Sequence, residues 1–194
     1  QKSTKTLLEV SKRLNVANFK KIGKNVQIGR NVYFRYPSEV EIGDNVIIDD
    51  FCYFTTSVKI GKYCHISPSC SVIGGKAAYF EVGDYCGIAA GCRIVCGSDD
   101  FLEGFGNATI PVQFRPKCRV AAVVIKKHVI VGSNTVILPD VTIAEGTAIG
   151  ALSLINKSTK EWYLYLGNPA KAMVPRNREE ILAKEQEFLS FQKK

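Results

Sequence analysis

The two histidines and the acidic pair at 99–100 are the first candidates in this sequence for moving a proton. His65 and His128 are its only histidines, and an imidazole can accept a proton near neutral pH. Asp99 and Asp100 are adjacent and could accept a proton or bind an amine, although adjacent acids also occur as turn residues or solvated charge. Which role applies depends on where the fold puts these side chains.

The basic residues point to an anionic partner. The net charge is +8, and basic side chains gather in residues 1–24 and again in residues 157–178. Such a charge suits nucleic acid, a membrane surface or an anionic small molecule. The two clusters form no continuous stripe and no nucleic-acid motif accompanies them. We therefore expect an anionic cofactor and no nucleic acid.

An internal repeat predicts the elements that position these residues. An apolar residue recurs every six positions in six groups of three, and the spacing lengthens by two residues after Phe34, by four after Val72 and by twenty-five after Ile94. Each irregularity falls at the same phase of an eighteen-residue period. The groups are Ile22, Ile28, Phe34; Ile42, Ile48, Phe54; Ile60, Ile66, Val72; Val82, Ile88, Ile94; Ile125, Val131, Ile137; and Ile143, Ile149, Ile155.

A six-residue period fits neither an α-helix nor a plain strand. It predicts a short strand plus a turn, three of which close one triangular coil, so the fold class is an all-β solenoid, a parallel β-helix of about six triangular coils. All insertions, including the long loop at 95–124, should leave from one edge of the column. Because a solenoid needs capped ends, we expect an N-terminal helical cap over 1–21, the β-helix over 22–159, and a closing strand with a C-terminal capping helix over 160–194.

The seven cysteines favour packing over metal binding. Five fall at the inward position of their repeats, where a small side chain fits beneath its neighbours: Cys52, Cys64, Cys70, Cys86 and Cys92. Without a Cys-x-x-Cys pair we expect no metal site, and Cys96 and Cys118 receive no assignment. The lack of an export signal or of an apolar run of ~18 residues predicts a cytoplasmic protein without membrane insertion.

The repeat and two later motifs resemble the hexapeptide-repeat acyltransferases over roughly residues 22–174. One motif runs from VIVGS at 129–133 through IGA at 149–151 to NK at 156–157, and the other is GNPAK at 167–171. The resemblance implies a left-handed β-helix, a homotrimer and acetyl-CoA as co-substrate. SDDF at 98–101 followed by NATIP at 107–111 is similar to the acetyltransferases of O-antigen and capsule pathways.

The resemblance also implies how the cofactor is held. In these enzymes the pantetheine arm lies in a groove between two subunits, where backbone groups of successive coils contact it. The matching positions are Ser133 and Ala151, eighteen residues apart and therefore stacked on adjacent coils. Lys157 would lie near the 3′-phosphate and Lys171 could assist, because a lysine binds phosphate as a point charge.

The resemblance leaves the catalytic base open. The galactoside and xenobiotic acetyltransferases carry a histidine where the long loop leaves the coil, and Asp99 stands there in this sequence. The candidates are Asp99 and His65, which points outward from its strand, whereas His128 fits better as a turn residue. Because His65 and Asp99 fall on different faces of the column, we expect them to meet only across a subunit boundary.

The expected reaction is direct attack of an acceptor amine or hydroxyl on the thioester carbonyl. The missing histidine favours an amine, because a hydroxyl needs a base more than an amine does. Asp100, Tyr79 and Arg115 are candidates for binding the acceptor, a nucleotide-linked sugar of bacterial surface polysaccharide biosynthesis such as that of lipopolysaccharide.

Three alternatives stay open. One is O-acetylation of a lipid-linked or polymeric saccharide. Carbonic anhydrases of this fold bind zinc through three histidines at a subunit boundary, whereas this sequence has two histidines at unsuitable phases. A non-enzymatic solenoid, such as an ice-binding protein with flat rows of threonine, would leave the long loop without a purpose.

Overall fold

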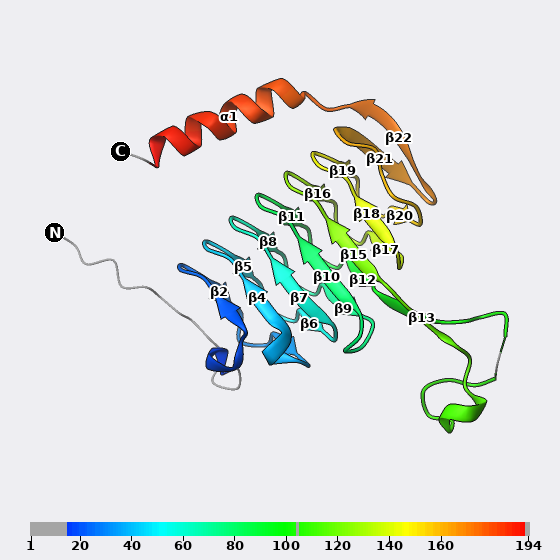
Figure 1. Ribbon diagram of the computed structural model, residues 1–194. Coiled ribbons are helices and arrows are strands. Elements are labelled where there is room, and N and C mark those ends of the chain that lie inside the picture. Colours follow the sequence, from blue (N-terminus) through cyan, green and yellow to red (C-terminus); the bar gives the residue numbers. More distant parts are fainter. Residues whose placement is uncertain (1–14, 104, 193–194) are drawn as a thin grey trace.

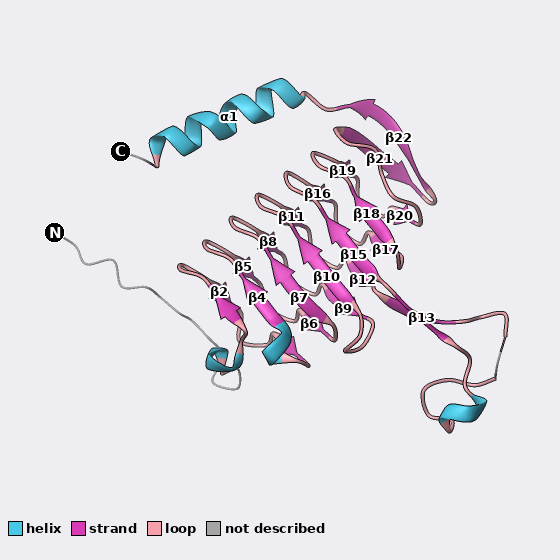
Figure 2. Ribbon diagram, in the orientation of Figure 1, coloured by secondary structure: helices cyan, strands magenta, loops and turns pink. Residues whose placement is uncertain are grey.

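The computed structural model of the protein describes residues 15–103 and 105–192. The chain winds as a left-handed parallel β-helix whose coils stack into a column (Figure 1 and Figure 2). Six complete coils are followed by β21, which begins a seventh. The predicted fold class is therefore confirmed.

Each coil contributes one short strand to each of three sheets, here named faces A, B and C. Face A holds β1 (Lys21–Ile22), β4 (Val40–Ile42), β7 (Ser57–Ile60), β10 (Tyr79–Val82), β15 (Ala122–Ile125) and β18 (Val141–Ile143). Face B holds β2 (Gln27–Ile28), β5 (Ile47–Ile48), β8 (His65–Ile66), β11 (Gly87–Ile88), β16 (Ile130–Val131), β19 (Ala148–Ile149), β21 (Tyr163–Gly167) and the antiparallel β22 (Ala170–Pro175). Face C holds β3 (Tyr33–Phe34), β6 (Tyr53–Phe54), β9 (Ser71–Ile73), β12 (Arg93–Val95), β17 (Val136–Ile137) and β20 (Leu154–Ile155).

Successive coils are in register, so the repeated apolar residues form inward ladders. Ile28 pairs with Ile48 and Ile48 with Ile66, and each of these side chains is 1% exposed. Burying one such side chain contributes ~1.5–3 kcal/mol. These ladders, more than any local strand propensity, hold strands that are only two to five residues long within the coils.

The inward cysteines also donate hydrogen bonds to turns of a neighbouring coil. The thiol of Cys70 donates to the carbonyl of Ala89, and that of Cys92 donates to the carbonyl of Gly132, both at 3.2 Å. On the next coil Thr135 takes the same position and donates to Gly150 O at 3.1 Å. A small donor at this position therefore satisfies a buried carbonyl as well as filling space. Hydrogen bonding with Cys52 and burial raise the pKa of Cys70 to about 11.

All three insertions leave where face C passes to face A, which we call the C–A corner. The first carries the 3-10 helix η2 (Pro37–Glu39) and the second joins β9 to β10. The long one contains the antiparallel pair β13 (Gly97–Asp99) and β14 (Cys118–Val120) with the 3-10 helix η3 (Val112–Phe114), and it projects from the column (Figure 1). The prediction of a single shared edge is confirmed.

The N-terminal prediction falls mostly outside the described residues. Of the helical cap expected over 1–21, the structure describes residues 15–21, which form the short 3-10 helix η1 (Val16–Asn18) and the beginning of β1. At the other end, the closing strand β21 folds back into β22, a hairpin that the sequence did not predict. The C-terminal helix α1 (Arg178–Phe191) begins where expected, with the side chain of Asn177 accepting from Glu180 N at 3.1 Å.

Helix α1 returns along the corner between faces A and B, the A–B corner (Figure 1). Tyr63, Tyr85 and His128 occupy equivalent left-handed turn positions there, and their rings stack with centroids 5.3 and 5.4 Å apart. Phe188 of α1 meets Tyr63 edge to face at 5.2 Å. The next coil has Gly146 at this turn, where an added Cβ would lie 2.3 Å from the Trp162 ring. Glycine therefore leaves room for the indole to extend the aromatic row.

Candidate functional site

A cavity of ≈ 660 Å³ lies at the C–A corner, at the base of the long insertion. One wall comes from β13, β14 and the residues between them, and the other from the corner turns that follow β17 and β20. Its lining is Val95, Ser98, Asp99, Asp100, Phe101, Leu102, Lys117, Cys118, Arg119, Leu138, Pro139 and Asn156. The cavity therefore combines two carboxylates, two cations and an apolar surface.

Asp99 and Asp100 differ in how their carboxylates are used. The two strands bring Asp99 opposite Cys118. Asp100 accepts a hydrogen bond from the backbone N–H of Leu102 at 2.9 Å, which anchors the start of the insertion. Among the described residues, no hydrogen bond or ion pair reaches the Asp99 carboxylate. Asp99 is therefore the carboxylate available to a ligand.

A surface ion pair ties the insertion to the column beside this cavity. Arg119 of β14 contacts Asp140 of the following corner turn, with Nη2 and Oδ2 2.9 Å apart. Asp140 has a left-handed φ of 65°, a conformation that aspartate tolerates better than most residues. The pair joins the two walls of the cavity at the surface, where its side chains are 66% and 70% exposed.

His65 lies on another part of the surface and has its own carboxylate. It stands on β8 of face B, and its Nε2 is 2.8 Å from Oδ2 of Asp49, which follows β5 in the preceding coil. Both side chains are partly exposed, at 50% and 39%. Asp49 also lines a smaller hollow of ≈ 420 Å³ with Gln27, Gly29 and Asp50 among its neighbours. His65 is thus already oriented within one chain, by a partner that the sequence did not suggest.

The two positions matched to cofactor binding are stacked as predicted. Ser133 and Ala151 lie at the corner between faces B and C, the B–C corner, on adjacent coils. The backbone N–H of Leu152 donates to Ser133 O at 2.9 Å. Face C separates this corner from the cavity, because its strands run from the B–C corner to the C–A corner. Within one chain the structure therefore does not bring Ser133 and Ala151 together with Asp99.

The two lysines matched to phosphate binding lie at different places. Lys157 is exposed and follows Asn156, which lines the cavity. Lys171 is exposed on β22, where it pairs with Leu166. Lys157 is therefore the one that lies beside the cavity.

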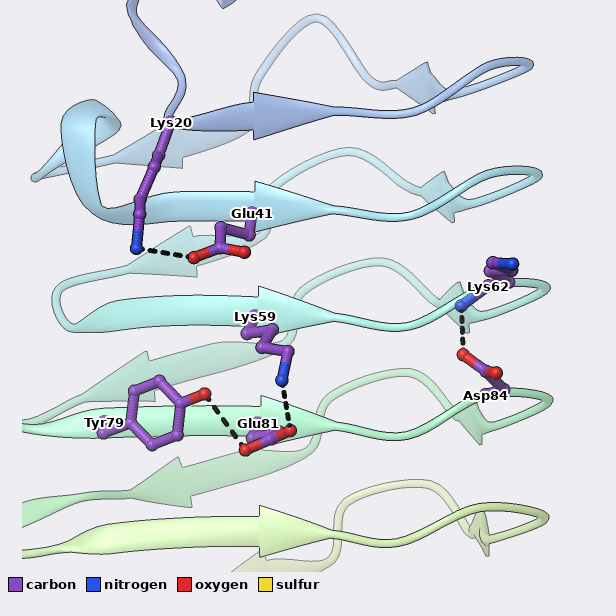
Figure 3. A network of polar contacts seen from close by, with 7 residues as sticks. All are labelled: Lys20, Glu41, Lys59, Lys62, Tyr79, Glu81 and Asp84. Carbon is purple, nitrogen blue, oxygen red and sulfur yellow. Dashed lines mark hydrogen bonds and ion pairs between the residues drawn. The ribbon is translucent and has the colours of Figure 1, made fainter.

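Two predicted acceptor-binding residues lie outside the cavity lining. The hydroxyl of Tyr79 donates to Glu81 at 3.0 Å, and Glu81 also pairs with Lys59 at 2.8 Å (Figure 3). This network belongs to the solvated outer surface of face A. Arg115, within the long insertion, donates from Nε to the carbonyl of Ile110.

His128 is a turn residue, as expected, and it also holds α1. It has a left-handed φ of 62°, and its Nε2 lies 2.9 Å from Glu185 of α1, whose other oxygen pairs with Lys127 at 2.6 Å. Burial raises the pKa of Glu185, but hydrogen bonds with Lys127 and His128 outweigh burial and leave that pKa below its ordinary value. His128 therefore has a structural role, because it holds α1 against the A–B corner.

Sequence reasoning missed four residues of the site, namely Asp49, Leu138, Pro139 and Asn156. Asp49 directly follows Ile48 inside an unbroken group of the repeat, so the breaks in the repeat did not mark it, although an acid sixteen residues before an outward histidine lies on the preceding coil. Asn156 adjoins the matched Lys157 and could have been found. Cys96 is buried, which raises its pKa to about 12, and Cys118 is exposed in the cavity.

Two further features concern metals and membranes. The described part of the chain contains no cluster of three or more His, Cys, Asp or Glu side chains arranged to hold a metal ion. Within the same ranges, no helix has the length and apolar character needed to cross a bilayer.

Comparison with known proteins finds one family and several relatives. Residues 39–74 match the family described as bacterial transferase hexapeptide (six repeats). The chain is 34% identical over 172 residues to a dTDP-4-amino-4,6-dideoxy-D-glucose acyltransferase of Escherichia coli, which covers 86% of this chain and 87% of that protein.

Solved structures give the same picture. AntD, an N-acyltransferase from Bacillus cereus in complex with dTDP and 3-hydroxybutyryl-CoA, superposes with a TM-score of 0.84 at 36% identity, over 92% of this chain and 94% of that one. A variant of AntD with dTDP-4-amino-4,6-dideoxyglucose and coenzyme A gives a TM-score of 0.82 at 37% identity, over 89% and 91%. A maltose O-acetyltransferase from Clostridium difficile, at 20% identity and a TM-score of 0.56 over 84% and 72%, shares the fold.

Proposed function

Because the chain belongs to the hexapeptide-repeat acyltransferases, we propose that it transfers the acetyl group of acetyl-CoA to the amino group of a nucleotide-linked sugar. The cavity at the C–A corner carries this proposal, because its one carboxylate free of described partners, Asp99, faces a space large enough for a sugar ring. Relatives of 34% and 37% identity act on or bind dTDP-4-amino-4,6-dideoxyglucose. The acceptor proposed for this chain is therefore a dTDP-linked 4-amino-4,6-dideoxyhexose.

The reaction needs a base, an acyl donor and a site for the negative charge that develops on oxygen. Asp99 accepts a hydrogen bond from the sugar amine and draws a proton from it. The amine nitrogen attacks the thioester carbonyl, the C–N bond forms, and the C–S bond breaks as coenzyme A leaves and takes up a proton. A backbone N–H near the base of the insertion is the donor for the oxyanion. Asp100 supports the geometry through its bond to Leu102 N.

The proposed site is completed by a second subunit. Six large apolar side chains are exposed around the B–C corner and its two faces: Tyr33, Ile47, Phe51, Tyr53, Ile130 and Leu152. A homotrimer that buries them would bring this corner against the C–A corner of the next subunit. His65, Ser133 and Ala151 of one chain would then face the Asp99 cavity of its neighbour.

In that arrangement each candidate residue has a role. Ser133 and Ala151 contact the pantetheine arm through their backbones, and Lys157, with Lys171 assisting, binds the 3′-phosphate. His65, oriented by Asp49, is the alternative base, which would take the amine proton in place of Asp99 and return it to the leaving thiolate of coenzyme A. Lys117 and Arg119 supply positive charge for the diphosphate, and Tyr79 and Arg115 stay candidates for contacts farther along the nucleotide.

The proposed setting is the cytoplasm, in the synthesis of precursors for lipopolysaccharide or another surface polysaccharide. All seven cysteines are free thiols, which suits a reducing compartment.

The test is an assay of thiol release from acetyl-CoA with dTDP-4-amino-4,6-dideoxyglucose, and with dTDP-glucose as the matched hydroxyl control. We expect release, and an N-acetylated product by mass spectrometry, with the amino sugar alone. Comparable release with the hydroxyl sugar would replace N-acetylation by O-acetylation. If neither sugar causes thiol release although acetyl-CoA binds tightly, the acceptor is instead a lipid-linked or polymeric saccharide.

A further inference from the structure

Helix α1 is attached to the column along one narrow seam at the A–B corner (Figure 1). Phe188 packs edge to face on Tyr63 and Tyr85, with ring centroids 5.2 and 6.2 Å apart, and Glu185 forms ion pairs with the same corner. No residue of α1 is buried, and none belongs to the core cluster of the column. The core of the column therefore forms without the helix.

This seam is made within one chain. The A–B corner lies opposite face C, whereas the proposed homotrimer joins the B–C corner of one subunit to the C–A corner of the next. That assembly uses the other two corners of each column. The contacts of α1 therefore do not depend on a neighbouring subunit.

The joint between β22 and α1 is anchored to the column, but the helix beyond it is held by side chains. The backbone N–H of Arg176 donates to Trp162 O at 2.7 Å, and its Nη1 donates to the carbonyls of His128 and Gly146 at 3.0 and 2.6 Å. Among the described residues, no backbone hydrogen bond joins residues 178–191 to a coil. Rotation at Asn177 would therefore move α1 and leave the β21–β22 hairpin in place.

Glu185 supplies the charge that holds the seam closed. Its side chain is 7% exposed, and its oxygens lie 2.6 Å from Lys127 Nζ and 2.9 Å from His128 Nε2, on the turn after β15. Burial and this carboxylate raise the pKa of Tyr85, which lies next to Asp84 on the turn after β10. In every other described ion pair each side chain is at least 30% exposed, so those pairs contribute little.

Acid removes the charge on Glu185. Because its folded-state pKa is lowered, the carboxylate stabilises the closed helix above the ordinary glutamate pKa of ~4.3, and this contribution is lost as the pH falls through the folded-state value. Lys127 and a protonated His128 then lie side by side without a counter-charge. On α1 itself Lys184 pairs with Glu180 on the exposed side. A released helix of 14 residues is only marginally stable in water.

We propose that α1 is a strap that opens in acid as a unit, turning at Asn177 while the column stays folded, and that Glu185 is the residue that holds it closed. Opening uncovers the aromatic row of Tyr63, Tyr85 and His128. This inference concerns the A–B corner alone and does not depend on the proposed reaction.

The experiment follows hydrogen exchange and tryptophan fluorescence between neutral pH and pH ~3. Trp162 is the only tryptophan; it is 7% exposed, and Arg178 of α1 lies 5.7 Å from its ring. Opening should shift its emission to longer wavelength. Relative to the amides of β8 and β11, the amides of α1 should exchange at least about tenfold faster at the acid end, because a buried hydrogen bond to a charged group is worth about that factor.

Two variants should open the strap by different routes. Glu185→Gln should give fast exchange in α1 already at neutral pH, with no further change in acid. Phe188→Ala alters no titrating group and should raise the pH at which α1 opens. Glu187→Gln is the matched control, because it neutralises an exposed acid of the same helix, and it should behave as the wild type.

Three results would overturn the inference. Loss of protection in α1, β8 and β11 at the same pH would show that helix and column unfold together. Wild-type exchange of α1 in Glu185→Gln would remove this residue from the closure. An equal effect of Glu187→Gln would show that the total charge of the helix matters and not the contact of Glu185 with the turn after β15.

Discussion

The A–B and C–A corners of the same column use their side chains in opposite ways. At the A–B corner Tyr63, Tyr85 and His128 stack on one another and are covered by α1, where Glu185 is 7% exposed and contacts Lys127 and His128. At the C–A corner Asp99 shares a cavity with cationic and apolar residues, and no described residue pairs with its carboxylate. His128, Lys127 and Glu185 at the first corner are partnered within the chain, whereas at the second Asp99 has no described partner and is available to a ligand.

The difference shows how one repeat supports both stability and chemistry. The coil geometry fixes the position of each corner but does not fix the residue that occupies it. The same column can therefore have stacked aromatic side chains at one corner and inserted loops at another. The following variants test whether the two corners are as separate as the structure indicates.

The largest effect is expected at Asp99. Replacing it with asparagine keeps the shape but removes the proton acceptor, a role worth ~10²–10⁴-fold in rate. We expect Asp99→Asn to lower kcat at least a hundredfold with an unchanged melting temperature, measured by steady-state kinetics and thermal unfolding.

The control is Glu103→Gln, which neutralises an exposed acid of the same insertion that does not line the cavity. It should retain wild-type kcat. A second arm, His65→Gln, distinguishes the two candidate bases: a loss at His65 that exceeds the loss at Asp99 would transfer the role of base to the histidine.

A smaller effect, on stability alone, is expected at Glu185. Glutamine keeps one acceptor oxygen but replaces the other by an NH2 donor and removes the charge, so only one of Lys127 and His128 keeps its acceptor at this mostly buried site, at a cost of ~1–3 kcal/mol. For a chain of this size, 194 residues, each kcal/mol lowers the melting temperature by ~2–4 °C. Glu185→Gln should therefore melt several degrees lower, and Glu179→Gln, in the exposed first turn of the same helix, should not.

The pH dependence of that loss has a definite sign. The folded-state pKa of Glu185 is lowered, so its contribution is complete above the ordinary glutamate pKa of ~4.3 and disappears as the pH falls below it. Wild-type and Glu185→Gln stabilities, followed by thermal melts between neutral pH and pH ~3, should converge at the acid end. A constant gap would contradict a role for the charge.

The smallest effect is expected at Lys157. Replacing it with alanine removes one point charge near the 3′-phosphate, so the KM for acetyl-CoA should rise about tenfold while kcat changes little. Lys160→Ala, an exposed lysine three residues farther on, is the matched control. An unchanged KM would remove Lys157 from the phosphate site.

The fold could be predicted from the sequence because the six-residue spacing of the apolar residues follows from the geometry of the triangular coil. The spacing of Ile22, Ile28 and Phe34 and its later copies reports which residues point inward, and the phase of each insertion reports its corner. The start of α1 was likewise readable from the acids that follow Asn177. The β21–β22 hairpin was not, because its second strand lies outside the six-residue period.

The site was harder to predict because its parts come from different coils. Asp99 and Asp100 were found where the repeat breaks, but Leu138 and Asn156 enter the cavity only through the stacking of the coils above. Asp49 is similar, since its contact with His65 depends on register between neighbouring coils. The repeat in the sequence shows which face of the column a residue belongs to. Which side chains meet at a corner can be seen only in the three-dimensional structure.

The shared exit of all three insertions has an evolutionary consequence. Each coil closes its backbone hydrogen bonds with the coils next to it, so a segment added at the C–A corner leaves the register of faces A, B and C unchanged. Loops can be lengthened, shortened or exchanged between homologues at that edge without refolding the column. Segments that contact the substrate can therefore change at that edge while the column stays the same.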